Sequence, residues 1–150
     1  MQLSALHLIE KVLLLKNIPI FAQTPEHILA EVAHLLKEEY LPANSLIFKQ
    51  GDVGNCMYII FKGEVKIHID KTHLATLKAN DLFGEFALLD TENRSASATT
   101  LSDCLMFKLD HEPFYELMEN RIEVAIGIIR NLCSRIRILN QQLEVAQKKT

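Results

Sequence analysis

Hydrophobic residues in this chain recur with one period near its two ends and with another in its middle, and this switch limits the folds that it can form. Near both ends the apolar residues are three or four positions apart, which is the spacing of an amphipathic helix. In the middle they occur in short runs bounded by turn residues, which is typical of β-strands. The strand-like runs cover 46–49, 57–61, 64–69, 73–77, 96–100 and 104–109.

The run at 64–69 shows the strand pattern most clearly. Val65, Ile67 and Ile69 are apolar, whereas Lys66 and His68 between them are polar, so the run predicts one buried face and one wet face. Turn-forming residues separate the runs at 42–44, 51–55, 62–63, 70–71 and 80–81. Several short strands at this spacing predict an antiparallel sandwich, jelly roll or barrel.

Helical segments flank the strand region. They cover 3–16, 24 to about 37–39, 110–118 and 121–146. Pro19 separates the first two helices, because it lacks a backbone donor. Thr24 suits the N-cap position of the second helix. The predicted fold class is therefore mainly β: an antiparallel β-roll or jelly roll with N-terminal helices and a long C-terminal helix. Its predicted parts are an N-terminal helix at 1–16, a β-roll domain at 17–120 and a C-terminal helix at 121–150.

The long helix repeats its apolar residues in alternating steps of three and four, which is the pattern of a coiled-coil seam. The seam consists of Ile122, Ala125, Ile129, Leu132, Ile136, Leu139, Leu143 and Ala146. It predicts a homodimer through residues 122–146. Packing of the same stripe within one chain is the alternative, and the sequence leaves both open. The apolar segment 3–16 further predicts a neighbouring domain of a longer protein that covers it.

Charge and cysteine content argue against several functions. A net charge of −3 disfavours a general nucleic-acid binder, which usually carries a basic excess. The odd set of Cys56, Cys104 and Cys133 lacks CxxC spacing, which predicts a reducing compartment rather than a disulfide framework. No run approaches the ~18 apolar residues of a spanning helix, and the start lacks a signal peptide's pattern. We expect no direct nucleic-acid contact, no membrane insertion by this segment, and a place in the cytoplasm or at the cytoplasmic face of a membrane protein.

The stretch 81–96 carries the clearest chemical signal. Gly84 permits close backbone approach, and 85–89 can form a helical turn or two whose first N–H groups suit an anion. Arg94 offers a planar bidentate donor for phosphate, and the next two residues add a hydroxyl and backbone donors. Glu85 would repel an anion unless it accepts a hydrogen bond from a ligand hydroxyl. A phosphate beside a sugar hydroxyl satisfies all of these groups.

Phe-Gly-Glu-Phe-Ala-Leu-Leu at 83–89 and Arg-Ser-Ala at 94–96 resemble the phosphate-binding cassette of the cyclic-nucleotide-binding domain family. That family includes kinase regulatory subunits, cyclic-nucleotide-gated channels and bacterial catabolite activators. Residues 17–21, 41–52 and 57–65 also resemble the family's helical entry, first strands and next hairpin. The resemblance implies a regulatory sensor in which the β-roll binds a 3′,5′-cyclic nucleoside monophosphate and the C-terminal helix acts as lid and dimerisation element.

The resemblance also implies roles for individual residues. Glu85 accepts a hydrogen bond from the ribose 2′-hydroxyl, and Arg94 pairs with the exocyclic phosphate oxygens. The phosphate cradle is completed by Gly84, Phe86, Ala87, Ser95 and Ala96. The C-terminal helix caps the base with Leu139 or Asn140. Ser95 admits either adenine or guanine, and we expect cAMP in preference to cGMP, with no metal and no other cofactor.

Other interpretations fit the sequence less well. A structural ion pair between Glu85 and Arg94 is the alternative to ligand contact. The histidines are dispersed, and no Ser–His pair or P-loop is present, so we expect neither a metal site nor an enzyme. A ligand-free interaction or dimerisation module with the same fold is the alternative function. A transcription regulator needs a helix-turn-helix domain after the long helix, and we expect none before Thr150.

Overall fold

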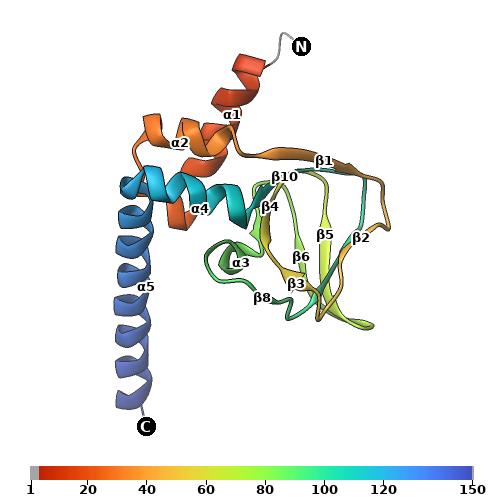
Figure 1. The fold of residues 1–150 in the computed structure, drawn as a ribbon. Helices are drawn as coiled ribbons and strands as arrows, with labels where there is room; N and C mark the ends of the chain where they lie inside the picture. The colour runs from red at the N-terminus through yellow and green to blue at the C-terminus, as the bar shows by residue number, and fades with distance from the viewer. Residues whose placement is uncertain (1–3, 150) are drawn as a thin grey trace. The chain divides into compact units, whose positions relative to one another are not determined.

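The computed structural model describes residues 4–149, with side chains from residue 7 onward, and Figure 1 shows its ribbon. Residues 1–3 of the predicted N-terminal helix lie outside the described residues. The chain divides into two compact units, one of residues 1–34 with 117–150 and the other of residues 35–116. Each unit is described by itself below.

Residues 35–116 form an antiparallel β-roll, as the sequence predicts. One four-stranded sheet has the order β1-β10-β4-β7 and the other has the order β2-β9-β5-β6, while β3 and β8 pair separately. All neighbouring strands run antiparallel. The strands are β1 (Lys37–Leu41), β2 (Leu46–Phe48), β3 (Val53–Gly54), β4 (Cys56–Lys62), β5 (Val65–Ile69), β6 (Thr72–Leu77), β7 (Leu82–Phe83), β8 (Glu92–Asn93), β9 (Ser97–Thr100) and β10 (Cys104–Asp110).

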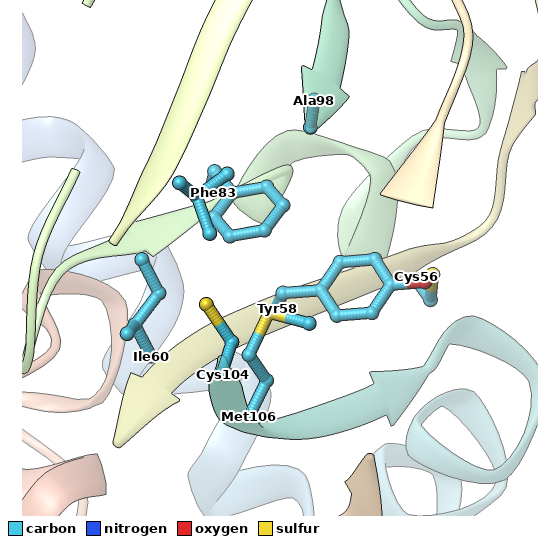
Figure 2. Close-up of a cluster of buried hydrophobic side chains, with 8 residues drawn as sticks. Cys56, Tyr58, Ile60, Phe83, Ala98, Cys104 and Met106 are labelled. Carbon is cyan, nitrogen blue, oxygen red and sulfur yellow. The ribbon is translucent and has the colours of Figure 1, made fainter. Parts of the chain in front are cut away.

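The core of this unit is organised around β4, in which residues 56–60 are all buried. A strand covered on both faces has a continuous apolar run instead of alternation. Figure 2 shows the cluster on one side of β4. Its members are Cys56, Tyr58, Ile60, Val65, Phe83, Ala98, Cys104 and Met106. The rings of Tyr58 and Phe83 stack with centroids 5.1 Å apart, which fixes β7 against β4.

The tight turns of the β-roll fall where the sequence places turn residues. Asn44, Asp70 and Asn80 all have positive φ, a conformation that asparagine and aspartate tolerate better than most residues. Asp81 adds a side-chain bond, since its Oδ2 accepts from the N–H of Lys78 at 2.9 Å. The turn at Asn80 and Asp81 directly precedes β7 and so sets where that strand begins.

The other unit consists of helices. α1 (Ser4–Lys16), η1 (Pro19–Phe21), α2 (Glu26–Ala33) and α5 (Ile122–Lys148) belong to it, and α4 (His111–Asn120) crosses from the β-roll unit into it. α1 packs on α2, and α5 packs on η1. A Cβ atom on Gly127 of α5 would lie 3.1 Å from Oγ1 of Thr24, so glycine permits that close approach. Nε of Arg121 donates to Oε2 of Glu31 at 2.8 Å.

Two local predictions about the second helix are wrong. It ends at Ala33 instead of near 37–39, because Lys37–Leu41 pairs with β10 as β1. The ladder between distant residues overrides the local helical preference of a Lys-Glu-Glu run. Thr24 does not cap the helix either: Pro25 is the cap residue, no side-chain cap bond forms, and Thr24 is buried.

Candidate functional site

The stretch that the sequence predicts for an anion begins where β7 ends. Gly84 follows β7 with a φ of 78°, in the left-handed region that favours glycine. The short helix α3 (Glu85–Leu89) begins at the next residue, in agreement with the helical turn predicted there. The glycine therefore turns the chain sharply from strand to helix.

Arg94 is fixed by its backbone. It directly follows β8, which pairs with β3. Its N–H donates to the carbonyl oxygen of Asp52 at 2.7 Å, and its carbonyl oxygen accepts from the N–H of Gly51 at 2.9 Å. Because backbone bonds hold residue 94 on both sides, the start of its side chain has a defined place in the roll.

The side chain of Arg94 is held by neutral groups. Nη2 donates to the carbonyl oxygen of Cys56 at 2.8 Å and lies 3.3 Å from the Sγ atom of the same residue. Cζ lies 4.2 Å from the centroid of the Phe48 ring, in cation–π contact. Nε is buried and has no acceptor in the part of the chain that the structure describes.

Two glycines make room for this guanidinium. A Cβ atom on Gly84 would lie 2.5 Å from Nη1 of Arg94. A Cβ atom on Gly54 would lie 2.8 Å from the carbonyl oxygen of Glu92 and 3.0 Å from Nε of Arg94. The structure thus brings together Gly84 and Arg94, two of the residues that the sequence assigns to one site.

Among the described residues, the contacts of the Arg94 guanidinium are with neutral groups. Among the ion pairs of the described side chains, none joins Arg94 to a carboxylate. Burial raises the pKa of the nearby Tyr58 far above its usual value, so this phenol stays neutral. Arg94 is only 8% exposed. A buried cation without a counter-charge is costly, and an anion beside it would offset that cost.

Hydrogen-bond donors and an acceptor neighbour Gly84 and Arg94 in the sequence. Glu85 is half-buried with its Oε2 atom shielded from solvent, and a carboxylate can only accept hydrogen bonds. Among the described residues the N–H groups of Phe86, Ser95 and Ala96 have no acceptor. The N–H of Ala87 donates to the carbonyl oxygen of Gly84 at 3.1 Å, so this predicted cradle donor is engaged within α3. The arrangement can bind an anion that also carries a hydroxyl.

The remaining predicted features belong to other parts of the chain. Leu139 and Asn140 are exposed on α5, in the helical unit, and their role as a base cap stays a prediction. The described residues hold no group of three His, Cys, Asp or Glu side chains that could bind a metal ion. None of the helices described here is long and apolar enough to cross a membrane.

Three contacts of Arg94 were not predicted from the sequence. The sequence places Phe48 in a strand-like run and Gly54 in a turn, and it indicates of Cys56 only that it belongs to no disulfide framework. Their positions in strands β2, β3 and β4 bring them to an arginine about 40 residues later. The repeated glycines at 51 and 54 were the only local signal of a close backbone approach there.

The chain is similar to several known proteins. A family model described as "Cyclic nucleotide-binding domain" matches residues 38–121, more than half of the chain. The "Cyclic AMP receptor protein" of Thermus thermophilus is 31% identical over 139 residues, which cover 87% of this chain and 63% of that protein. The "cGMP-dependent protein kinase, isozyme 1" of Drosophila melanogaster is 31% identical over 120 residues, which cover 73% of this chain and 15% of the kinase.

A solved structure shows the same architecture. It is the N-terminal domain of a transcriptional regulator from Streptomyces coelicolor A3(2), with a TM-score of 0.80 and 28% identity, and the match covers 85% of this chain and 95% of that one. The chain spans less than two thirds of the length of the curated relatives named above.

Proposed function

Since the chain belongs to the cyclic nucleotide-binding domain family, we propose that it is a regulatory sensor that binds a 3′,5′-cyclic nucleoside monophosphate and passes its occupancy to the C-terminal helix. The observation that carries the proposal is the buried guanidinium of Arg94, whose hydrogen bonds within the described part of the chain go to neutral groups. A cyclic phosphate supplies the single negative charge that this environment lacks. The proposal assigns no catalytic step to the chain.

The proposed contacts follow the groups around Arg94. The guanidinium pairs with the exocyclic phosphate oxygens, and the N–H groups of Phe86, Ser95 and Ala96 donate to the same phosphate. Gly84 admits the ligand close to the backbone. Glu85 accepts a hydrogen bond from the ribose 2′-hydroxyl, which explains a carboxylate next to an anion site.

We propose cAMP in preference to cGMP as the ligand, with the base capped by Leu139 or Asn140 of α5. The names of the relatives include both a cyclic AMP receptor and a cGMP-dependent kinase. The preference of this chain for adenine or guanine is therefore tested by titration with both nucleotides. The three free cysteines fit a reducing cytoplasm, where we place this domain.

We further propose that α5 pairs with α5 of a second copy. The seam residues Ile129, Ile136 and Leu143 are each more than half exposed, and they recur at the seven-residue spacing of a coiled coil. Exposed apolar rows of this length are usually covered by a partner. Sedimentation equilibrium tests this: we expect a dimer that Ile136→Lys dissociates, and a wild-type monomer at tens of micromolar contradicts it.

Calorimetric titration with cAMP and with cGMP tests the ligand. We expect saturable heat with at least one of them, a loss of at least about a hundredfold in affinity for Arg94→Ala, and a smaller loss for Arg94→Lys, which keeps the charge but not the bidentate fork. Lys49→Ala, at an exposed cation near the same strands, is the matched control. No heat from either nucleotide on folded protein would favour the ligand-free module with the same fold.

A further inference from the structure

The sulfur of Cys56 lies inside the candidate anion site. Its Sγ atom accepts a hydrogen bond from Nη2 of Arg94 at 3.3 Å, and the same nitrogen donates to the carbonyl oxygen of Cys56 at 2.8 Å. The thiol is buried and free of any disulfide. The proposed contacts with a nucleotide do not involve this sulfur, so the site contains a nucleophilic atom to which the proposed function gives no role.

A second donor points at the same sulfur. Figure 2 shows the ring of Tyr58 directed toward Cys56. Burial raises the pKa of Tyr58 most, and the nearby Cys56 raises it further through its charge and through a side-chain hydrogen bond. A hydrogen bond that favours the protonated phenol is one that the phenol donates. The Cys56 sulfur therefore accepts hydrogen bonds from a cation and from a neutral hydroxyl.

Cys104, the other buried cysteine, has the opposite surroundings. Its Sγ atom donates to the carbonyl oxygens of Glu64 and Ser102, each at 3.3 Å. Burial raises the pKa of this thiol, which keeps it in the less reactive protonated form. The two buried sulfurs therefore differ in kind, because Cys104 acts as a donor whereas Cys56 acts as an acceptor.

The surroundings of Cys56 suit a negatively charged sulfur. The thiolate is the form of cysteine that attacks oxidants, and a guanidinium and a phenol are hydrogen-bond donors that stabilise an anion. Arg94 is only 8% exposed, and its Nε atom has no acceptor among the described residues, so this cation retains capacity for an anionic partner. An oxygen atom bound to Sγ would meet the same guanidinium that the phosphate of a ligand needs.

We propose that Cys56 is an oxidation site within the anion site, and that its sulfenic acid competes with the nucleotide phosphate for Arg94, an inference that rests on the proposed function. The opening that admits a phosphate to Arg94 also admits a molecule as small as hydrogen peroxide. In the reaction the O–O bond of the peroxide breaks and one oxygen atom forms a bond to Sγ. The sulfur loses two electrons, and the other oxygen atom takes up the thiol proton and leaves as water.

The step is reversible. Two molecules of a small thiol reduce the sulfenic acid, become one disulfide and release the oxygen as water. While the oxygen is present it occupies space beside Arg94 and accepts a hydrogen bond from the guanidinium, which is then less available to a phosphate. Oxidation therefore lowers nucleotide affinity, and a bound nucleotide slows oxidation in return.

Peroxide treatment of the Cys133→Ser protein tests the proposal, because this substitution removes the exposed thiol and leaves the buried ones. Dimedone labelling followed by mass spectrometry locates the sulfenic acid, and calorimetric titration with cAMP and with cGMP gives the affinity. We expect Cys56 to be labelled about tenfold or more faster than Cys104, and saturating nucleotide to suppress that labelling. Peroxide should lower nucleotide affinity by about tenfold or more, and dithiothreitol should restore it.

Further variants in the Cys133→Ser background separate the charge from the sulfur. Arg94→Met fills the space of the guanidinium without its charge and should slow the labelling of Cys56 several-fold, whereas Arg94→Lys keeps the cation and should react at an intermediate rate. Cys56→Ser should have the same nucleotide affinity before and after peroxide. Cys104→Ser is the matched control at the other buried cysteine, and its affinity should still fall after peroxide.

Labelling of Cys56 that is no faster than that of Cys104, or that is unchanged in Arg94→Met, overturns the oxidation site and leaves the proposed function intact. The same holds for an affinity that survives complete oxidation of Cys56, for a loss of affinity that dithiothreitol does not reverse, and for a peroxide effect that persists in Cys56→Ser. A reduced protein that produces no heat with cAMP or cGMP overturns the proposed function, and the competition at Arg94 falls with it.

Discussion

A Cβ atom on residue 84 would lie 2.5 Å from Nη1 of Arg94, closer than such atoms approach in folded proteins. The close contact joins a strand-to-helix turn to an arginine ten residues later. It makes the absence of a side chain at 84 a requirement of the anion site as well as of the backbone.

Gly84→Ala is expected to weaken nucleotide binding by about tenfold or more, because the guanidinium must move away from the phosphate position. The left-handed φ of 78° adds about 1–3 kcal/mol of strain. Gly51→Ala is the control, since it has a φ of 91° and no atom within 4 Å of the new Cβ. Equal affinity losses in the two variants, by calorimetry, would attribute the effect to the backbone alone.

Arg94→Met should abolish nucleotide binding without lowering the stability of the ligand-free protein. Removing a buried charge that lacks a counter-ion is often neutral or stabilising when the replacement fills the space. We expect the melting temperature of the ligand-free protein to stay the same or rise by a few degrees. Added cAMP should raise the melting temperature of wild type only. A strong destabilisation of the ligand-free variant would mean that Arg94 is a structural residue.

Phe48→Leu should lower nucleotide affinity without abolishing it. The ring holds one face of the guanidinium, and a cation–π contact contributes ~0.5–2 kcal/mol, or a few fold to about thirtyfold in affinity. Phe61→Leu is the control, because Phe61 packs edge-on against Phe107 instead. Binding isotherms that match for the two variants would remove Phe48 from the site.

Glu31→Gln should make the free energy of unfolding depend less on pH in the acid range. The hydrogen bond from Arg121 holds the pKa of the Glu31 carboxyl below its usual value in the folded protein. A lowered folded pKa contributes stability that is fully present above the ordinary carboxyl pKa and is lost as the pH falls through the lowered one. The urea midpoints of wild type and variant should therefore differ at pH 7 and converge in acid.

The effect at Glu31 should be small and should shrink in high salt, because the pair is exposed. Glu144→Gln, at an exposed carboxylate on α5, provides the control titration. A midpoint difference between wild type and Glu31→Gln that persists at the lowest pH would show that the side chain acts through packing rather than charge.

Much of the fold could be predicted because the signal is local. The alternation around Val65 and Ile67 marks β5, and the stepwise repeat after Arg121 marks α5 to within two residues. β1 could not be predicted, since its polar Lys-Glu-Glu start favours a helix and only its pairing with β10 makes it a strand. The two-residue strands β3, β7 and β8 are too short for any period to show.

The candidate site also contains residues that could be predicted from the sequence and residues that could not. Gly84, Glu85 and Arg94 could be predicted, because they lie in one short motif with a phosphate chemistry of its own. Cys56 contributes a carbonyl oxygen, which every residue has, so its identity gives no signal. His111 and Tyr115 of α4 hydrogen-bond to carbonyl oxygens of α3, more than 20 positions earlier in the chain. Contacts between residues so far apart could not be predicted from a local pattern.

The backbone bonds of Arg94 to the 51–52 turn also bear on how this region can diverge between relatives. Residues 90–93 are exposed, and the arginine takes its place from its bonds to Gly51 and Asp52 and from the pairing of β8 with β3, rather than from the residues between α3 and β8. Insertions between α3 and β8 extend an exposed loop at little entropic cost. The length of this loop can therefore vary among homologues while residues 83–89 and 94–96 keep their positions in the fold. A sequence search that fixes the spacing between Glu85 and Arg94 would overlook such homologues.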